Sequence, residues 1–266
     1  RFLYPGAHDR PAGRKRSLWQ NLTEMWRMQS YRRILLSGLL RTPSGLMNLL
    51  QMTVLSYYFG NNGRTPYVHY MLLLGIPAFL GQLIAAGAAP KLADKHGAAT
   101  TFAQANVFAG LALLAAFALF LCRPQQLTQA LPFTLLILLL FCNMFCCGLV
   151  NTVQSILSAD AADLTEKESG IRRDGIFVSG QSLLIKLSTG VSALLQGLVF
   201  AISGFSGTAV RQINRALYAG ADFATDPSFA TPRFAMFFLF LCLPGIAYLL
   251  SALPYRKGRN PHKAPV

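Results

Sequence analysis

The stretch that decides the fold is IFVSGQSLLIKLSTGVSALLQGLVF, residues 176–200. It is long and mostly apolar, and its only ionisable side chain is Lys186. An ammonium group inside a membrane helix costs about 2.5–3.5 kcal/mol on insertion scales unless it faces a partner or a watery cavity. At helical spacing the lysine shares a polar face with its neighbours, which predicts the wall of a transport pathway. The alternative is a lysine that forms an ion pair within the bundle and only holds helices together. This face consists of Ser179, Ser182, Lys186, Thr189, Ala193 and Gln196.

Composition indicates that the whole chain is a membrane protein. Of its 266 residues, 53% are hydrophobic and 13% are charged, and the mean hydropathy is +0.41. Soluble domains carry about 25% charged residues. A membrane helix needs about 20 apolar residues, and backbone groups in lipid must pair internally, so we predict an all-α polytopic fold with six transmembrane helices. The six apolar stretches are 34–59, 68–88, 101–121, 132–157, 176–202 and 234–253.

These stretches define a predicted bundle over residues 34–253. The basic segment 1–33 is expected to be a cytoplasmic linker with an amphipathic piece, and 254–266 a basic cytoplasmic tail. The chain opens on Arg1 in a polar segment, which suggests either a start partway through a longer protein or a lost natural start. The glycine- and proline-containing segment 203–233 favours a flexible connector over a partly ordered lid.

The basic residues behind the formal net charge of +14 are distributed along the chain in a way that indicates membrane topology and not a nucleic-acid-binding patch. If the first span enters from the cytoplasm, the cytoplasmic side holds 17 of the 24 Lys and Arg residues and the opposite side holds five. This asymmetry follows the positive-inside rule. We therefore expect a multi-pass protein of the plasma (inner) membrane with both termini cytoplasmic, surrounded by the lipid bilayer and without a nucleic-acid partner.

The sequence offers no pattern typical of catalysis. The five cysteines lie in or beside apolar runs at spacings that match no zinc site, so we interpret them as packing residues. No nucleophile constellation, metal cluster or glycine-rich phosphate loop is present in the sequence. We predict no enzyme activity, no metal and no cofactor.

Polar residues also interrupt the first and fourth apolar stretches. Arg41 lies about 12 Å beyond Arg33 along a helix. It either extends back to the cytoplasmic face or points into a central cavity. The run Thr42-Pro43-Ser44-Gly45 predicts a kink directly after it. Asn151 and Gln154 are three residues apart and share a face, either to bind a solute or to hold helices together.

Half of the ten carboxylates lie between residues 160 and 174. Basic side chains are interspersed among them, which favours a salt-bridge network or gate on the cytoplasmic side over a plain solvated loop. The predicted gate consists of Asp160, Asp163, Glu166, Arg172, Arg173 and Asp174.

This acidic run and the helix after it resemble a signature of one transporter family. Two aspartates three residues apart precede an acidic residue, an arginine, a further acidic residue and a lysine one helix later. This order is similar to that of the glycoside–pentoside–hexuronide:cation symporters, the melibiose permease-like family of the major facilitator superfamily. Leu164, Thr165 and Lys167 depart from the family's Tyr, Gly and Tyr. The matching positions are Asp160, Asp163, Glu166, Arg172, Asp174, Ser179 and Lys186, with Gln154 upstream.

The resemblance implies the C-terminal six-helix half of a major facilitator fold, with the N-terminal half as its partner. It implies secondary active transport by alternating access, in which a sugar, glycoside or similar small polar solute moves together with H⁺ or Na⁺. The residues expected to bind the substrate or couple it to the ion are Lys186, Gln154, Asn151, Gln181, Ser182, Thr189 and Arg41.

Two other functions stay open at this point. The chain could be a truncated, non-transporting membrane fragment or scaffold. It could also be a lysolipid-type symporter of the same fold, which a wide apolar cleft beside Lys186 would favour.

Overall fold

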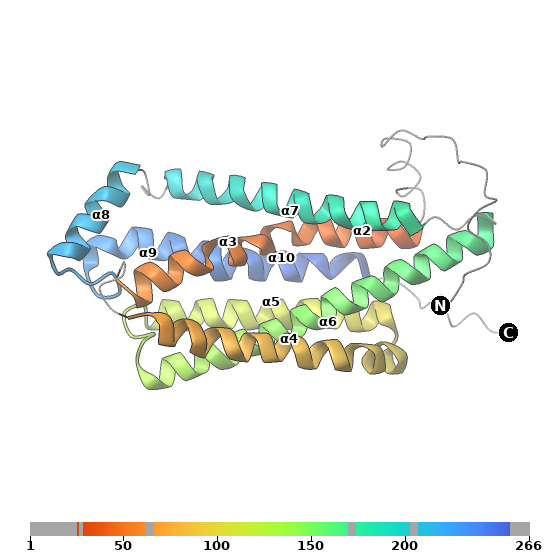
Figure 1. Ribbon diagram of the computed structural model, residues 1–266, viewed down its shortest axis with the longest axis horizontal. Helices are drawn as coiled ribbons and strands as arrows, with labels where there is room; N and C mark the ends of the chain where they lie inside the picture. The colour runs from red at the N-terminus through yellow and green to blue at the C-terminus, as the bar shows by residue number, and fades with distance from the viewer. Residues whose placement is uncertain (1–25, 27–28, 62–65, 170–173, 203–206, 256–266) are drawn as a thin grey trace, which may run out of the picture.

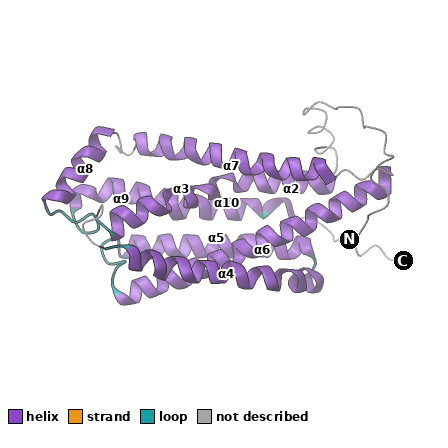
Figure 2. Ribbon diagram, viewed as in Figure 1, coloured by secondary structure: helices purple, strands orange, loops and turns teal. Residues whose placement is uncertain are grey.

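The computed structural model describes residue 26 and residues 29–61, 66–169, 174–202 and 207–255, so most of the predicted linker and tail lie outside the described residues. Every regular element in these ranges is helical (Figure 2). The prediction of an all-α, polytopic membrane protein is confirmed. Within the described residues, five helical segments are long and apolar enough to cross a membrane: Val68–His96, Ala98–Cys122, Ala130–Leu164, Ile185–Ile202 and Pro227–Tyr255.

The first apolar stretch, 34–59, is an interrupted helix made of several consecutive helical pieces. None of these pieces is long enough to cross a membrane alone. Pro43 has no N–H to continue the α-helical hydrogen-bond ladder, and the predicted kink is confirmed there. The pieces are α2 (Gln29–Arg41), the 3₁₀ turn η1 (Thr42–Gly45), α3 (Leu46–Val54) and the π-helical turn η2 (Leu55–Phe59).

The later helices run alternately between the two ends of the bundle (Figure 1). Helices α4, α5 and α6 pack on one another, α10 packs on α5 and α2, and α7 packs chiefly on η1, α2 and α3. Helix α7 therefore forms an edge of the bundle. The bounds are α4 (Val68–His96), α5 (Ala98–Cys122), α6 (Ala130–Ser169), α7 (Asp174–Ile202), α8 (Gly207–Ala219), α9 (Ala230–Phe237), η4 (Phe238–Cys242) and α10 (Leu243–Ser251).

Small residues bring α4 and α6 into close contact, as their abundance in the second apolar stretch predicts. A Cβ added at Gly148 would lie 2.7 Å from the Cβ of Ala85, and one added at Gly81 would lie 3.0 Å from the carbonyl oxygen of Phe141. Gly75, by contrast, faces open space. Close backbone approach of this kind stabilises helix association in lipid. Lipid tails are as apolar as the helix side chains, so the hydrophobic effect does not drive the helices together there.

A buried hydrogen-bonded chain joins α2, α10 and α5. Ser37 Oγ donates to the carbonyl oxygen of Ser251 at 2.6 Å, and Ser251 Oγ donates to Asn106 Oδ1 at 2.8 Å. All three side chains are fully buried. Beside them Gly110 and Gly245 let α5 and α10 touch, because a Cβ at Gly110 would lie 2.7 Å from the Gly245 carbonyl oxygen.

The segment between α7 and α9 is ordered where the structure describes it, so the prediction of a flexible connector over 203–233 was wrong. Helix α8 buries Ile213 and Leu217 and lies across one end of the bundle (Figure 1). Buried Arg233 donates to the carbonyl oxygens of Phe223 at 2.9 Å and Ala224 at 2.6 Å, which holds the following loop. Hydrogen bonds donated by Ser228 hold the pKa of Asp226 in this loop below its ordinary value.

Helix α6 is longer than a bilayer is thick. Its 40 residues span about 60 Å, against about 40–45 Å for a bilayer with its headgroups. Figure 1 shows α6 tilted and projecting past the ends of α4 and α5. The acidic segment that begins at Asp160 therefore continues the helix to Ser169 instead of forming a loop.

We expect Gly110→Ala to destabilise the bundle by about 1–3 kcal/mol, because the new methyl group meets a backbone oxygen that no rotamer change can move. Gly75→Ala is the matched control. It meets open space and gains helix propensity, so its stability should equal or exceed that of the wild type. Thermal unfolding of the purified proteins in detergent measures both effects, and equal midpoints for the two variants would contradict the close α5–α10 contact.

Candidate functional site

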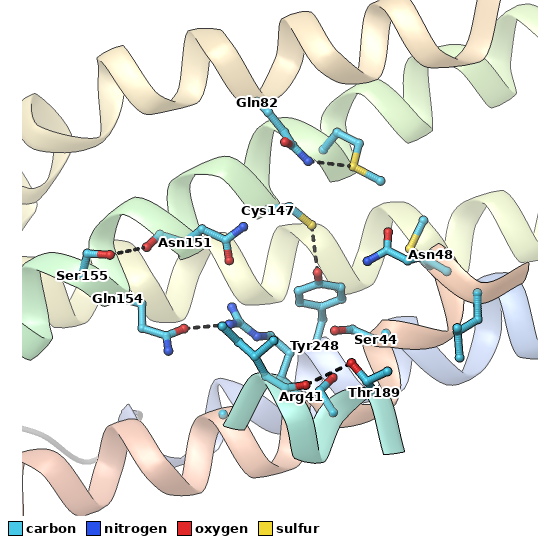
Figure 3. A pocket seen from close by; sticks show the side chains of 17 residues that line it. Arg41, Ser44, Asn48, Gln82, Cys147, Asn151, Gln154, Ser155, Thr189 and Tyr248 are labelled. Carbon is cyan, nitrogen blue, oxygen red and sulfur yellow. Dashed lines mark hydrogen bonds between the residues drawn. The ribbon is translucent and has the colours of Figure 1, made fainter. Parts of the chain in front are cut away.

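A polar cavity of about 610 Å³ lies near the middle of the bundle. The first span, α4, α6, α7 and α10 all contribute to its wall (Figure 3). Hydroxyl and amide groups line much of it, although the helices around it are apolar. The lining residues are Gly38, Arg41, Ser44, Gly45, Met47, Asn48, Leu49, Gln82, Met144, Cys147, Asn151, Gln154, Ser155, Ile185, Ser188, Thr189 and Tyr248.

The break in the first span places Arg41 at this cavity. Pro43 cannot donate to the Leu39 carbonyl oxygen, and Thr42 Oγ1 donates to it instead at 2.8 Å. Helix α2 therefore ends at Arg41 without leaving that carbonyl unpaired in the apolar bundle. Of the two orientations that the sequence allows for Arg41, the structure shows the one that points into the cavity.

Arg41 crosses the cavity to α6. Its Nη2 donates to Gln154 Oε1 at 2.6 Å, as Figure 3 shows. None of the seventeen lining residues is acidic, so the wall supplies no counter-charge to the guanidinium. A guanidinium whose other N–H groups face a cavity can donate charge-assisted hydrogen bonds to a solute hydroxyl or carboxylate.

The floor of the cavity is a buried hydrogen-bonded pair. Cys147 Sγ and the Tyr248 hydroxyl lie 2.8 Å apart, and both side chains are buried. Behind them Asn143 Nδ2 donates to the Ala109 carbonyl oxygen at 3.2 Å, away from the cavity. The two asparagines of α6 therefore differ in role, because Asn143 joins α6 to α5 while exposed Asn151 faces the cavity.

Helix α7 is attached to the broken span by two serines. Ser188 Oγ and Ser192 Oγ donate to the Thr42 carbonyl oxygen at 2.8 and 3.0 Å. The approach requires Gly45, because a Cβ there would lie 2.7 Å from Ser192 Oγ. This contact brings Thr189 to the cavity wall.

A smaller, apolar cavity of about 60 Å³ adjoins the polar one. The two share the lining residues Met47, Asn48 and Met144, and the rest of the smaller cavity is mostly aliphatic and aromatic. The combined space therefore offers a polar chamber and a short apolar extension.

Comparison with known families decides what kind of protein carries this cavity. The family model described as MFS/sugar transport protein matches residues 4–256. The chain belongs to the MFS/sugar transport protein family. Comparisons with curated proteins and with solved structures found no match. An MFS/sugar transport protein is a membrane transporter of small solutes, and the prediction of a major facilitator superfamily protein is confirmed.

In this MFS protein, the predicted solute-binding residues fall into two groups. Arg41, Asn151, Gln154 and Thr189 come together around the cavity. Lys186 and Ser182 are exposed on α7 and are not among the cavity-lining residues. The side chain of Gln181 lies outside the described residues.

The orientation of α7 explains this division. Ser188 and Ser192 form the packed face, and Ile185 and Thr189 lie beside it on the cavity wall. Lys186 follows Ile185 by about 100° around the helix, so it occupies the exposed face next to the cavity. Of the polar face predicted around the lysine, Ser182 and Lys186 are therefore exposed beside the cavity, whereas Thr189 lines it.

The predicted gate residues lie on the projecting end of α6 as far as the structure describes them. Asp160 and Asp163 are exposed and Glu166 is half-buried. Arg172, Arg173 and the Asp174 side chain lie outside the described residues. The acidic groups lie about two to three helical turns beyond Gln154, at the end of α6 that projects from the bundle.

Several cavity residues were not predicted. Gln82 is the only amide in the second apolar stretch, and a single polar side chain in such a stretch could have indicated a cavity-lining position. Tyr248 carried no comparable signal, because a single tyrosine in an apolar span also suits a membrane interface.

We expect Asn151→Cys to react with a small charged methanethiosulfonate reagent and Asn143→Cys to stay unlabelled, both in a background without the native cysteines. The two positions lie on the same helix, but Asn151 lines the cavity whereas Asn143 is fully buried against α5. Labelling is measured by the mass of the purified protein. Equal labelling at both positions would contradict a water-accessible cavity at Asn151.

Proposed function

We propose that the chain is the C-terminal half of a cation-coupled symporter for a sugar, glycoside or similar small polar solute. The observation that carries the proposal is the polar cavity, which lies near the middle of otherwise apolar helices and contains an arginine with no acidic residue among the other lining side chains. Polar groups at membrane depth are costly and are kept where a solute or an ion passes. Family membership supports a transporter, and the cavity chemistry supports a hydroxyl-rich solute.

The proposed solute is recognised by a small set of donors and acceptors. The Arg41 guanidinium, the Asn151 and Gln154 amides and the Thr189 hydroxyl surround a space large enough for a mono- or disaccharide. The adjoining apolar cavity suits one apolar edge or substituent of such a solute. A lysolipid needs a long apolar cleft, and the lining of the central cavity is better matched to a polar solute.

The second wall of the proposed pathway is an N-terminal six-helix half of the same transporter. Helix α7 is the edge of this bundle, and Lys186 and Ser182 are exposed there beside the cavity. Major facilitator transporters rock one half against the other around a site near the membrane midplane. In this arrangement Lys186 contacts the solute or balances the carboxylates that bind the coupling ion, H⁺ or Na⁺.

The acidic end of α6 is the proposed inner gate. In this proposal the gate is formed by Asp160, Asp163 and Glu166 together with Arg172 and Arg173, which lie outside the described residues, and its ion pairs break when the cavity opens to that side. We propose that the gate and both termini lie at the cytoplasmic face of the plasma (inner) membrane, and the excess of Lys and Arg expected on that side supports this orientation.

We expect Lys186→Ala to abolish uphill uptake of a sugar, because the ammonium group contributes to coupling across the two halves. Lys91→Ala is the matched control, since Lys91 is exposed on α4 and does not line the cavity. Uptake is measured in cells that express the complete gene, with sugars supplied under a sodium or a proton gradient and membrane expression verified for each variant.

Unchanged uphill uptake by Lys186→Ala would rule out the assigned role of the lysine. If the wild type takes up no sugar under either gradient, symport of this class is contradicted and a non-transporting scaffold is favoured. Uptake of a fluorescent lysolipid without sugar uptake would favour the lysolipid-type symporter.

A further inference from the structure

A groove of about 610 Å³ follows the seam between α5 and α6 and reaches the last turns of α4. Its floor is made of small buried residues, Ala105 and Ala112 of α5 and Cys146 of α6, while larger apolar side chains form its rims. Its α5 residues recur every three or four positions and form one stripe. From Thr101 to Ala115 this stripe is about 20 Å long, which covers the roughly 15 Å depth of one hydrocarbon leaflet.

The groove lies on the opposite side of α6 from the polar cavity. Cys142 and Leu149 line the groove, whereas Cys147 and Asn151 line the cavity, and the two sets are offset by about half a turn of the helix. The groove is therefore on the outer surface of helices that span the membrane, outside the path proposed for the solute. The atoms on the floor of an open apolar groove in that position lose van der Waals contacts unless a flexible apolar chain fills the groove.

One end of the groove is polar and positively charged. His96 and Gln104 line it there, and Lys95 is exposed next to His96. Asp94, the acidic residue of the same turn, lies on the opposite side of α4 from the groove residue Leu92 at 100° per residue. The N-terminus of α5 lies at the same turn and adds partial positive charge.

We propose that this groove binds one anionic phospholipid, with an acyl chain along the α5–α6 seam and its headgroup at the α4–α5 turn. The apolar floor matches an acyl chain in length and chemistry, and the residues at its end match a phosphate-bearing headgroup in charge. Basic pockets between membrane helices on the cytoplasmic side are a recognised setting for anionic headgroups. The lipid site is independent of the solute that the central cavity carries.

The acyl part of the proposal is tested with a matched pair of alanines on α5. Ala115 and Ala118 are both exposed, but only Ala115 lines the groove. The purified chain in detergent is titrated with dioleoyl phosphatidylglycerol, and bound lipid is counted by native mass spectrometry. We expect one retained lipid in the wild type and in Ala118→Trp, and several-fold weaker retention in Ala115→Trp, whose indole fills the groove.

The headgroup part is tested by charge. Dioleoyl phosphatidylcholine, titrated in the same way, should bind more weakly than phosphatidylglycerol. Lys95→Ala should weaken phosphatidylglycerol binding about fivefold, the effect of one basic residue near an anionic headgroup, and Lys167→Ala on the end of α6 should leave it unchanged.

Three results would overturn the proposal. The first is equal loss of lipid from Ala115→Trp and Ala118→Trp while both variants keep the wild-type unfolding temperature. The second is equal binding of phosphatidylglycerol and phosphatidylcholine. The third is a dimer mass without bound lipid, which would assign the groove to a second copy of the chain.

Discussion

The attachment of α7 to the bundle, and with it one wall of the cavity, depends on one backbone carbonyl, that of Thr42. It lies directly before Pro43, where the first span changes from α-helix to a 3₁₀ turn in an apolar region. Ser188 and Ser192 both donate to it, and Gly45 leaves the room they need. This contact joins α7 to the first span and brings Thr189 to the cavity wall, beside Arg41 at the end of α2. The kink at Pro43 and the attachment of α7 therefore meet at the same point of the first span.

Helix α6 separates two chemical environments. One side carries Asn151 and Gln154 into the polar cavity, and the other side carries Cys142 and Leu149 to the outer groove. The separation works because Gly148 lets α4 approach closely and Asn143 ties the helix to α5, so α6 has little freedom to rotate. The polar residues Asn151 and Gln154 therefore face the cavity and not the lipid, and the groove residues Cys142 and Leu149 stay outside the proposed solute path.

Much of this fold is visible in the sequence, because apolar runs of about 20 residues, proline breaks and small-residue stripes act locally. The kink at Pro43 and the shared face of Asn151 and Gln154 follow from spacing alone. Which face of α7 packs against the bundle does not follow from the sequence. Serines mark both the packed face and the stripe around Lys186, and only the partner carbonyl of Thr42 distinguishes the two. The order of the segment before α9 depends on Arg233, whose backbone acceptors lie seven to ten residues upstream and form no recognisable motif.

The spacing of the two serines gives the α7 contact a preferred direction of sliding. If α7 moved by one turn, about 5.4 Å, so that later residues met the first span, Ser192 and Gln196 would stand opposite the Thr42 carbonyl and both could donate to it. A shift of the same size the other way would bring Leu184 and Ser188 to that oxygen, and of these only Ser188 could donate. The Thr42 carbonyl would thus keep two donors after one displacement of α7 and a single donor after the reverse, which favours the first displacement.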